Sequence, residues 1–371
     1  MKNEKDDVKI TQICHGKIIP SYSSAYALRC NRYLDKFANR IAFSVGGLIF
    51  KDISNRHAKQ FRSIIMTGLA FLKGRRSLEI LISKGKLIRT KYLKELQKSL
   101  LSSEVVIFEG PWQYRLVKGQ IQNKLIIYDA HNVESVLRTG NEWEKYTFEL
   151  EKELSERADL IITVSEEDKE QISSIYNISH NKILSIPEGF ETPRTAWDNT
   201  SNEVVFIGSA YGPNIEAANE IIKIAEKLPQ YNFKIIGSVC SSLHRKKPQN
   251  VKCLGIIDNK KKELEICSSF LALNPVNIGS GRNLKMNDYI SHGIPIITTE
   301  IGSRGFAEVL KRNFFIAEID EFPEKIKEIS TMSSELFKRS EAMIDYAKTN
   351  SYEKTMINSY NAIMNMLKLE S

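Results

Sequence analysis

The sequence predicts an α/β protein made of two doubly wound domains. Short apolar runs alternate with amphipathic stretches along the chain, a pattern typical of parallel sheets flanked by helices. Residues 188–202 carry polar side chains and a proline without any period, which predicts a linker. The 371 residues are enough for two domains of about 150–200 residues each.

The first domain, residues 1–187, is expected to contain a parallel sheet, because its apolar runs are short and are separated by longer amphipathic segments. Strands are predicted at Val8–Cys14, Ala42–Val45, Val105–Glu109, Leu125–Asp129, Leu160–Val164 and Ile183–Pro187. Helices are predicted at Ala25–Arg40, Ile53–Leu72, Thr90–Leu101, Thr147–Arg157 and Glu166–Tyr176.

The second domain, residues 203–351, repeats this alternation. Strands are predicted at Glu203–Gly208, Phe233–Gly237, Val251–Leu254, Phe270–Pro275 and Ile296–Thr299, and helices at Asn214–Leu228, Lys260–Ser268 and from Asn283 to His292. Three helical stretches follow, and the last, Tyr352–Leu369, is long enough to pack back onto the first domain. Ligands of such sheets bind outside the carboxyl ends of the strands, so we expect a site in the cleft between the domains.

Composition excludes several classes of protein. The five cysteines form no C-x-x-C pair and are odd in number, so reduced thiols are expected, and the six histidines do not cluster at metal spacing. The start, MKNEKDDVKITQI, lacks an apolar segment typical of signal peptides, and apolar stretches such as Ile41–Phe50 are too short to span a bilayer. A cytoplasmic protein is expected, at most attached to a membrane surface.

The positive charge of the chain is concentrated in residues 73–98. This stretch has nine Lys or Arg residues against Glu79 and Glu95, with leucines and isoleucines interleaved. A solvated helix face and an amphipathic surface resting on anionic lipid both fit this pattern. Nucleic acid is a third interpretation, but no aromatic stacking platform accompanies the charge, so we expect no nucleic-acid partner.

The segment GSGRNLKMNDYISHGIPIITTE, residues 279–300, has the properties of an anion site. It follows a predicted buried strand, and its two glycines allow a ligand to approach the backbone at the start of a helix, where free N–H groups favour negative charge. Arg282 and Lys285 add full positive charge, and Asp288 one turn on can accept hydrogen bonds from a ribose. Asn283 is the expected cap of the helix. A nucleoside diphosphate fits this pattern; an inert turn and other anions are the alternatives.

Five stretches, taken together, resemble glycosyltransferase family 4 enzymes of GT-B fold. They are YDAHNVES at 128–135, ADLIITVSEEDKEQI at 158–172, SIPEGF at 185–190, VVFIGSAYGPNIEAANEI at 204–221 and the segment that begins at Gly279. The resemblance implies two Rossmann-like doubly wound domains facing across a cleft. It also implies metal-independent sugar transfer from a nucleotide-sugar such as a UDP- or GDP-sugar, with retention of anomeric configuration. The first domain would bind the acceptor and the second the nucleotide.

The resemblance also suggests which residues bind the donor. The second of two glutamates common in the family falls on Asp288, and the first falls on Ser280, where this chain has no carboxylate. An Arg and a Lys that often follow the first strand of the second domain are absent, and Arg282 and Lys285 compensate for them. The predicted donor-binding residues are Gly208, Ser209, Gly237, Gly255, Ser280, Gly281, Arg282, Asn283, Leu284, Lys285 and Asp288.

Catalytic and acceptor-side candidates lie in the first domain. His131 follows a predicted strand and matches a family histidine near the donor sugar; the alternative is a structural loop histidine. Glu134 would orient His131 or begin a helix. Glu109 ends a strand beside aromatic residues, which suits either sugar contact or packing. Ser23 and Ser24 are further acceptor-side candidates.

The predicted function is therefore that of a hexosyltransferase-type glycosyltransferase. It would act on a glycan or lipid-linked acceptor in surface polysaccharide or glycolipid synthesis, without a metal or other cofactor, in the cytoplasm and at the inner face of the plasma membrane. The alternatives are a nucleotide-sugar 2-epimerase-like isomerase, which needs an acid–base set, and a non-catalytic nucleotide-sugar-binding subunit.

Overall fold

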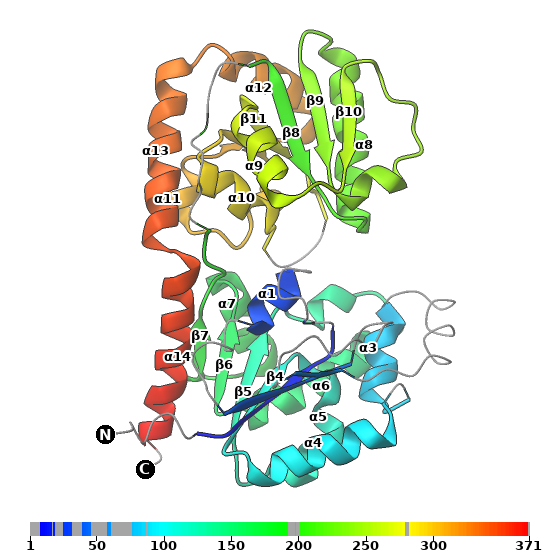
Figure 1. The fold of residues 1–371 in the computed structure, drawn as a ribbon, viewed down its shortest axis with the longest axis vertical. Coiled ribbons are helices and arrows are strands. Elements are labelled where there is room, and N and C mark those ends of the chain that lie inside the picture. Colours follow the sequence, from blue (N-terminus) through cyan, green and yellow to red (C-terminus); the bar gives the residue numbers. More distant parts are fainter. Residues whose placement is uncertain are drawn as a thin grey trace. The chain divides into compact units, whose positions relative to one another are not determined.

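The computed structural model describes residues 8–16, 18, 25–31, 39–45, 58–60, 76–86, 88–191, 197, 201–278 and 282–369. The chain divides into two compact units (Figure 1). Unit 1 comprises Met1–Pro187 and Met356–Ser371, and unit 2 comprises Glu188–Thr355. The residues expected to form a separate linker thus group with unit 2, and most of the last helix groups with unit 1.

Unit 1 is built on a parallel seven-stranded sheet in the order β3-β2-β1-β4-β5-β6-β7. The strands are β1 Ile10–Cys14, β2 Arg40–Ser44, β3 Ala58–Gln60, β4 Val105–Glu109, β5 Leu125–Ala130, β6 Leu160–Thr163 and β7 Ile183–Ser185. The helices are α1 Ala25–Asn31, α3 Arg76–Ser83, α4 Thr90–Ser102, α5 Tyr114–Val117, α6 Glu144–Arg157, α7 Glu166–Tyr176 and, in its larger part, α14 Tyr352–Leu369. Since connections between parallel strands cross over, the carboxyl ends of these strands meet at one edge.

Both faces of the unit 1 sheet are buried, as the near-continuous apolar strands require. In β4, Val106 and Phe108 belong to a cluster packed with α4, α6 and α7, whereas Val105 and Ile107 belong to a second cluster on the other face. The second cluster is completed by Ile363 and Met364 of α14 (Figure 1). The last helix therefore contributes to the core of unit 1.

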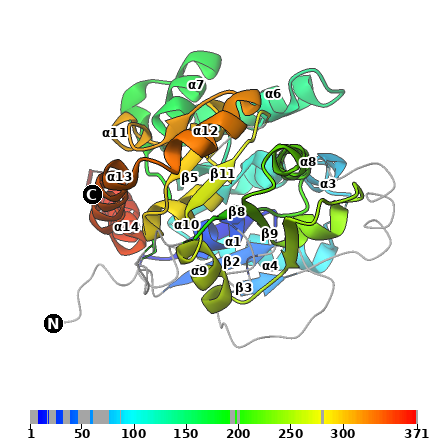
Figure 2. The same cartoon turned by 90° about the horizontal axis from the view of Figure 1, so that it is seen from above.

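Unit 2 has a parallel six-stranded sheet in the order β10-β9-β8-β11-β12-β13. The strands are β8 Glu203–Ile207, β9 Asn232–Ile236, β10 Val251–Gly255, β11 Leu271–Asn274, β12 Ile296–Thr298 and β13 Phe315–Ile316. The helices are α8 Gly212–Lys227, α9 Asn259–Cys267, α10 Lys285–His292, α11 Glu308–Lys311, α12 Phe322–Ile329 and α13 Ser333–Thr349. Helix α8 contacts α12, whereas α10 contacts α9 and α13, so both faces of the sheet are covered (Figure 2).

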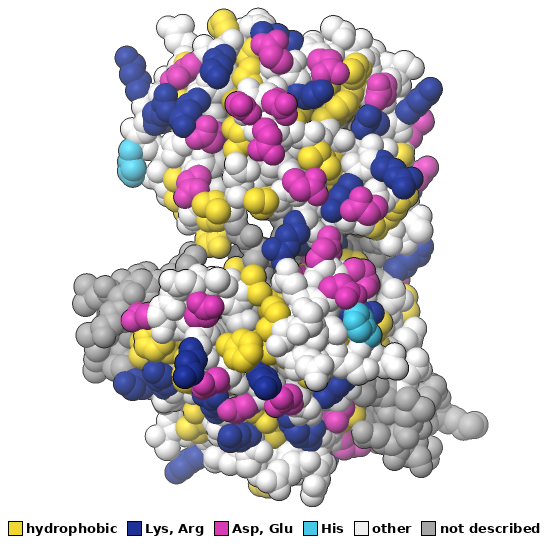
Figure 3. Space-filling model, turned by 180° about the vertical axis from the view of Figure 1, so that it is seen from behind, with side chains coloured by type: hydrophobic (Ala, Val, Ile, Leu, Met, Phe, Trp, Pro, Cys, Tyr) yellow, Lys and Arg dark blue, Asp and Glu magenta, His cyan; other side chains and the backbone are white. Residues whose placement is uncertain are grey.

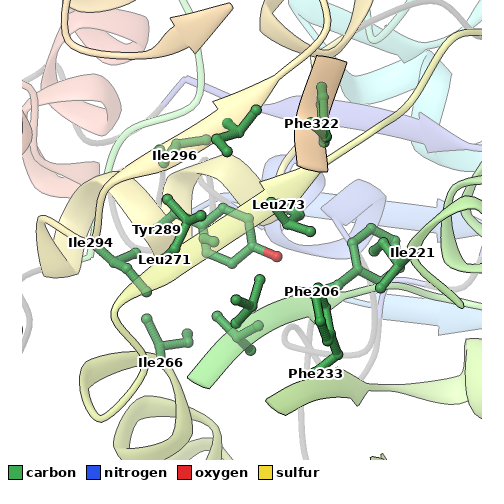
Figure 4. Packing of buried hydrophobic residues seen from close by; sticks show 14 of the residues in the cluster. Phe206, Ile221, Phe233, Ile266, Leu271, Leu273, Tyr289, Ile294, Ile296 and Phe322 are labelled. Atoms are coloured by element: carbon green, nitrogen blue, oxygen red, sulfur yellow. The ribbon is translucent and has the colours of Figure 1, made fainter. Parts of the chain in front are cut away.

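The core of unit 2 connects the sheet to helix α10 (Figure 4). Tyr289 of α10 is fully buried against Leu271 and Leu273 of β11. Its hydroxyl accepts the backbone N–H of Ile207 at 2.8 Å, which satisfies the polar atom inside the core. Phe206, the neighbour of Ile207 on β8, packs in the same cluster. Tyr289 thereby fixes α10 against the end of β8, where candidate site residues lie.

Two predicted helices in the first half are wrong in part. The helix predicted at Ala25–Arg40 is described only as α1, Ala25–Asn31, and Arg40 instead begins β2. Within the helix predicted at Ile53–Leu72, residues Ala58–Gln60 form β3, and the remainder lies outside the described residues. The backbone of β3 pairs with β2, and such edge pairing overrides local helical periodicity. The predicted cap of α10 is also wrong: Leu284, not Asn283, occupies the N-cap position.

The basic stretch 73–98 forms α3, a turn and the first part of α4 in its described residues. Tyr92, Leu96 and Leu100 of α4 are buried in unit 1, whereas Lys91, Lys94 and the other described basic residues of α4 face solvent. The apolar half of the pattern therefore serves the core. On the face drawn in Figure 3, basic and acidic side chains are interspersed over both units. None of the helices in the described part of the chain has the length and apolar character needed to cross a membrane.

Candidate functional site

The carboxyl edge of the unit 1 sheet holds a buried carboxylate–histidine pair. Glu109, the last residue of β4, is completely buried. His131 follows β5 directly, and its Nε2 lies 2.6 Å from Glu109 Oε2. Because a carboxylate accepts, Nε2 carries the proton and Nδ1 keeps a lone pair. Gln12 Nε2 donates to the other carboxylate oxygen, so Glu109 holds His131 in one tautomer and orientation.

Glu134, which we expected to orient His131, has a different partner. Its carboxylate pairs with Arg138 Nη1 at 2.5 Å, and both side chains are buried. Burial raises the pKa of Glu134, and the neighbouring Arg138 opposes that rise. The hydrogen-bond partner of His131 Nε2 is therefore Glu109, whereas Glu134 is close enough to His131 to interact with it through charge.

The aromatic residues beside Glu109 belong to the core. Trp112 and Tyr114 are both buried in unit 1, which supports the packing interpretation over sugar stacking for this pair. Tyr26 instead lies against His131, with ring centroids 4.7 Å apart. Of the acceptor-side predictions, Glu109 is thus a buried neighbour of His131, and Ser23 and Ser24 lie outside the described residues.

His15 is a site residue that the sequence reasoning missed. It follows β1 directly and donates through Nδ1 to the carbonyl oxygen of Glu109 at 2.8 Å. Burial, together with the nearby His131, lowers the pKa of His15 to about 3, so it is neutral at pH 7. The sequence does indicate this role, because a polar residue directly after a buried parallel strand lies at the ligand-binding edge of the sheet.

A third buried carboxylate, that of Glu151, fixes the loop that carries His131. Glu151 of α6 accepts the backbone N–H groups of Glu134 and Ser135 at 3.0 and 2.9 Å. It also accepts the hydroxyls of Tyr128 and Tyr176, each at 2.6 Å. Burial raises the pKa of Glu151, and the hydroxyl donors counteract this. Four donors on one carboxylate hold the loop after β5 in place. Only the tertiary structure shows this, since Glu151 lies mid-helix.

One group of side chains at this edge has the composition of a metal site. Among the described residues, Cys30, Glu109 and His131 place one ligand atom each within 4.8 Å of one another. The sequence predicts no metal because these residues are far apart in the chain and lack ligand spacing.

The carboxyl edge of the unit 2 sheet is formed by closely approaching backbones. Gly237 follows β9 with a φ of 106°, and a Cβ there would lie 2.2 Å from the Gly208 carbonyl oxygen. Its N–H donates to Gly255 at 2.7 Å, and the Gly208 N–H donates to Ile236 at 2.9 Å. Three predicted donor-binding glycines therefore meet at one place, and only glycine fits at Gly237.

Lys285, at the start of α10, is the cation of this edge. Its Nζ lies 2.7 Å from Asn214 Oδ1 and 3.2 Å from Asn274 Oδ1, and 4.8 Å from the centre of the Phe206 ring. Burial lowers its pKa to about 7. Among the described residues, no carboxylate forms an ion pair with it. A partly desolvated cation held only by neutral oxygens is suited to an external anion.

The neighbours of Lys285 orient its two amide partners. Ser209 Oγ accepts from Asn214 Nδ2 at 3.1 Å, which leaves Asn214 Oδ1 for Lys285. Asn274 Nδ2 donates to Gly302 and to Thr298 Oγ1, which orients Asn274 Oδ1 in the same way. Asn274 was not among the predicted residues. Its position as the last residue of β11 was the signal.

Arg282 and Asn283 are held by the protein itself. Arg282 donates to the Glu188 carbonyl oxygen and to Asn287 Oδ1, both at 3.0 Å. Its guanidinium lies 4.2 Å from the ring centre of Phe306 and 5.1 Å from that of Phe190. Asn283 Nδ2 donates to Gly302. These contacts tie the segment before α10 to residues 188–190 and to the loop after β12.

The remaining donor-side predictions are distributed around Lys285. Asp288 lies one turn further along α10, and its Oδ1 pairs with Lys262 Nζ of α9 at 2.9 Å. Its side chain is partly exposed, so it keeps access to solvent. Leu284 is the N-cap residue of α10. Ser280 and Gly281 lie outside the described residues.

Comparisons with known proteins give a fold and no close relative. No family model matches the sequence, and no curated protein matches it. Solved structures of similar fold, however, match nearly the whole chain. Sucrose-phosphate synthase from Thermosynechococcus elongatus has a TM-score of 0.74 at 12% identity, covering 98% of this chain and 100% of that chain.

Two further solved structures agree with this result. Anabaena HepE in complex with UDP-glucose has a TM-score of 0.70 at 12% identity, covering 95% of this chain and 99% of that one. WaaG, a glycosyltransferase involved in lipopolysaccharide biosynthesis, has a TM-score of 0.65 at 13% identity, covering 95% and 99%. The chain therefore has the fold of the GT-B glycosyltransferases, and the predicted α/β fold class is confirmed.

Proposed function

We propose that this protein is a glycosyltransferase that moves a sugar from a nucleotide-diphosphate sugar, such as a UDP- or GDP-sugar, to a glycan or lipid-linked acceptor. The GT-B fold supports a transferase, and solved structures of this fold include one bound to UDP-glucose. Transfer is proposed to proceed with retention, without a metal or other cofactor, in surface polysaccharide or glycolipid synthesis.

The observation that carries this proposal is the environment of Lys285. A cation at the carboxyl edge of a parallel sheet, close to the start of a helix and to glycine backbones, suits a diphosphate. Burial makes the charged form of Lys285 costly, and a bound diphosphate offsets that cost. We propose that Lys285 binds the diphosphate and that Asp288 binds the ribose. Gly208, Gly237 and Gly255 would allow the nucleotide to lie close to the backbone.

In unit 1 we assign the contact with the reacting sugar to His131. Glu109 accepts the Nε2–H of His131 and fixes the direction of the ring, so we assign to Nδ1 the contact with a sugar hydroxyl near the anomeric carbon. This role requires no proton transfer. Glu109 is a positioning residue, since its carboxylate is buried beneath His131.

We further propose that the basic residues of α4 bring the enzyme to an anionic membrane at its cytoplasmic face. Their side chains are exposed while the apolar side of α4 is buried, which favours contact by charge rather than by insertion. Vesicles of phosphatidylcholine with added phosphatidylglycerol should bind the wild-type chain. A Lys91→Glu/Lys94→Glu/Lys98→Glu variant should release it, and absence of wild-type binding would rule the membrane contact out.

A nucleotide screen followed by a transfer assay tests the main proposal. UDP, GDP and their sugars are compared by the shift in apparent melting temperature, because a ligand of the native state stabilises it. The donor that binds is then incubated with glycan and lipid-linked acceptors, and the product is analysed for its anomeric configuration. Binding of no nucleotide would contradict the proposal, and an inverted product would contradict retention.

A nucleotide-sugar 2-epimerase-like isomerase is the second candidate, because the Glu109–His131 pair supplies an acid–base group at the edge of unit 1. The two candidates differ in their need for an acceptor. An epimerase converts the sugar when donor alone is present, whereas a transferase requires the acceptor to release the nucleoside diphosphate at an appreciable rate. Nuclear magnetic resonance of the donor with and without acceptor separates them.

A further inference from the structure

We infer that the edge of unit 1 contains a binding site for a thiophilic divalent cation such as Zn²⁺, formed by Cys30 Sγ, the Glu109 carboxylate and His131 Nε2. The three ligand atoms come from α1, the end of β4 and the residue after β5. Metal binding itself does not depend on the proposed transferase activity. Its consequence for transfer does rest on that proposed function.

The geometry of the three groups is close to that of a bound zinc ion. They lie within 4.8 Å of one another, and zinc bonds of about 2.0–2.3 Å place tetrahedral ligands roughly 3.3–3.7 Å apart. Glu109 and His131 are already in contact at 2.6 Å through the Nε2 proton. A cation would replace that proton, and the ligands would move by about an ångström or less. The imidazole stays neutral with its proton on Nδ1, and the thiol proton leaves to solvent.

A buried amide, that of Gln12, contacts two of these three residues. Gln12 is completely buried, and its Nε2 donates both to the Glu109 carboxylate and to the Cys30 carbonyl oxygen. Among the residues that the structure describes, its Oε1 has no hydrogen-bond partner. The amide cannot be reversed without placing Oε1 against two acceptors. A buried acceptor without a donor is costly, and a cation or its bound water would satisfy it.

The donor set selects the metal. One thiolate, one imidazole and one carboxylate are ligands typical of zinc sites, whereas Mg²⁺ and Ca²⁺ prefer oxygen ligands only. Three protein ligands also leave a fourth position for water. The thiol of Cys14 lies within hydrogen-bonding reach of Cys30, so it is the alternative sulfur ligand that an experiment must distinguish.

A cation bound here would inhibit transfer rather than support it. It would occupy His131 Nε2 and Glu109, which the proposed mechanism uses to hold the imidazole in one tautomer and direction. We therefore expect transfer to proceed in metal-free protein and to be lost when the site is filled. Cys30 has no part in the proposed transfer, so a Cys30 variant is expected to lose metal binding while it keeps transfer.

Cobalt reports on the site directly, because a Co²⁺–thiolate bond has a charge-transfer absorption in the near ultraviolet. The tag-free, metal-free full chain is titrated with Co²⁺, and Zn²⁺ is then added to displace it. We expect the absorption to saturate at one equivalent, to be reversed by Zn²⁺ and to be unaffected by excess Mg²⁺. Absence of the thiolate absorption at excess Co²⁺ would overturn the inference whether or not the protein is a transferase.

Matched serine variants identify the sulfur ligand. Cys30→Ser should abolish the absorption and keep transfer, while Cys267→Ser, a buried thiol of α9, should keep both. Retention of the absorption in Cys30→Ser, or its loss only in Cys14→Ser, contradicts the assignment. If Cys30→Ser does not fold by circular dichroism, Glu109→Gln provides the test. It should weaken Co²⁺ binding at least about tenfold. Unchanged affinity in that variant would overturn the site.

Discussion

The buried charged side chains at the two sheet edges of this molecule differ in whether they contact a group of opposite charge. In unit 1 the buried acids have partners within the protein: Glu109 contacts His131, Asp129 contacts Arg29 at 2.5 Å, and Glu134 contacts Arg138. In unit 2 the cation at the edge, Lys285, contacts two amide oxygens, and no ion pair joins it to a carboxylate of the described residues.

This difference shows how one architecture provides two kinds of site. A buried carboxylate whose partner is already in place holds that side chain in one direction, which suits contact with a reacting group. A cation without an acid has its electrostatic partner missing, which suits an anionic ligand that brings its own charge. The lowered pKa of Lys285, caused by burial, is the sign of that missing partner.

Replacing His131 tests the unit 1 side and has the largest expected effect. His131→Ala should lower the rate of transfer about 100- to 1,000-fold, because a fixed dipole or charge near the reacting centre is lost. Calorimetric affinity for the nucleoside diphosphate should stay within about twofold of wild type. The matched control is His180→Ala, whose side chain is 53% exposed. Full activity of His131→Ala would remove its proposed role.

Replacing Lys285 tests the unit 2 side. Lys285→Ala should weaken binding of the nucleoside diphosphate by about 10- to 100-fold, since hydrogen bonds to charged groups contribute about 1.5–3 kcal/mol. Lys223→Ala is the control, because that lysine forms an exposed pair with Glu220 within α8. Calorimetry measures both. Equal dissociation constants for wild type and Lys285→Ala would mean that the diphosphate lies elsewhere.

The pH dependence of binding sharpens the comparison further. Since burial lowers the pKa of Lys285 to about 7, the cation is lost as the pH rises above 7, and affinity for the diphosphate should fall by up to about tenfold per unit between pH 7 and 9. Binding should take up protons in this range, because the bound anion raises the pKa again. Lys285→Arg should abolish the slope. A flat profile in the wild-type protein would contradict the assignment.

The smallest effect is expected at Asp288, which already pairs with Lys262 near the surface. Asp288→Ala should weaken a nucleoside diphosphate about three- to tenfold, by loss of about one hydrogen bond to the ribose. Inorganic pyrophosphate, which has no ribose, should bind both proteins equally. Asp345→Ala, an exposed acid of α13, serves as the control. An equal loss for pyrophosphate would show that Asp288 acts on the diphosphate instead.

Much of the fold follows from local patterns. The strands at Val105–Glu109 and Leu271–Asn274 and the helix at Glu166–Tyr176 coincide with apolar runs, caps and breaks visible in the sequence. Ser165 caps α7 by accepting the Asp168 N–H, and a serine just before a run of acidic residues is a cap signal visible in the sequence. The short edge strands β3 and β13 have too few residues to show an alternating apolar pattern in the sequence. They form because their backbones pair with those of β2 and β12, respectively.

What the sequence determined by itself is the alternation of elements, the place where each strand ends, and hence a set of residues expected at two sheet edges. His131, Lys285 and the glycines were found in this way. The partners of those residues were decided only by tertiary structure. Glu109 rather than Glu134 contacts His131, and Asn214 and Asn274 rather than an acid contact Lys285. The physical reason is that periodicity and capping act within one element, whereas hydrogen bonds and desolvation act between elements brought together by folding.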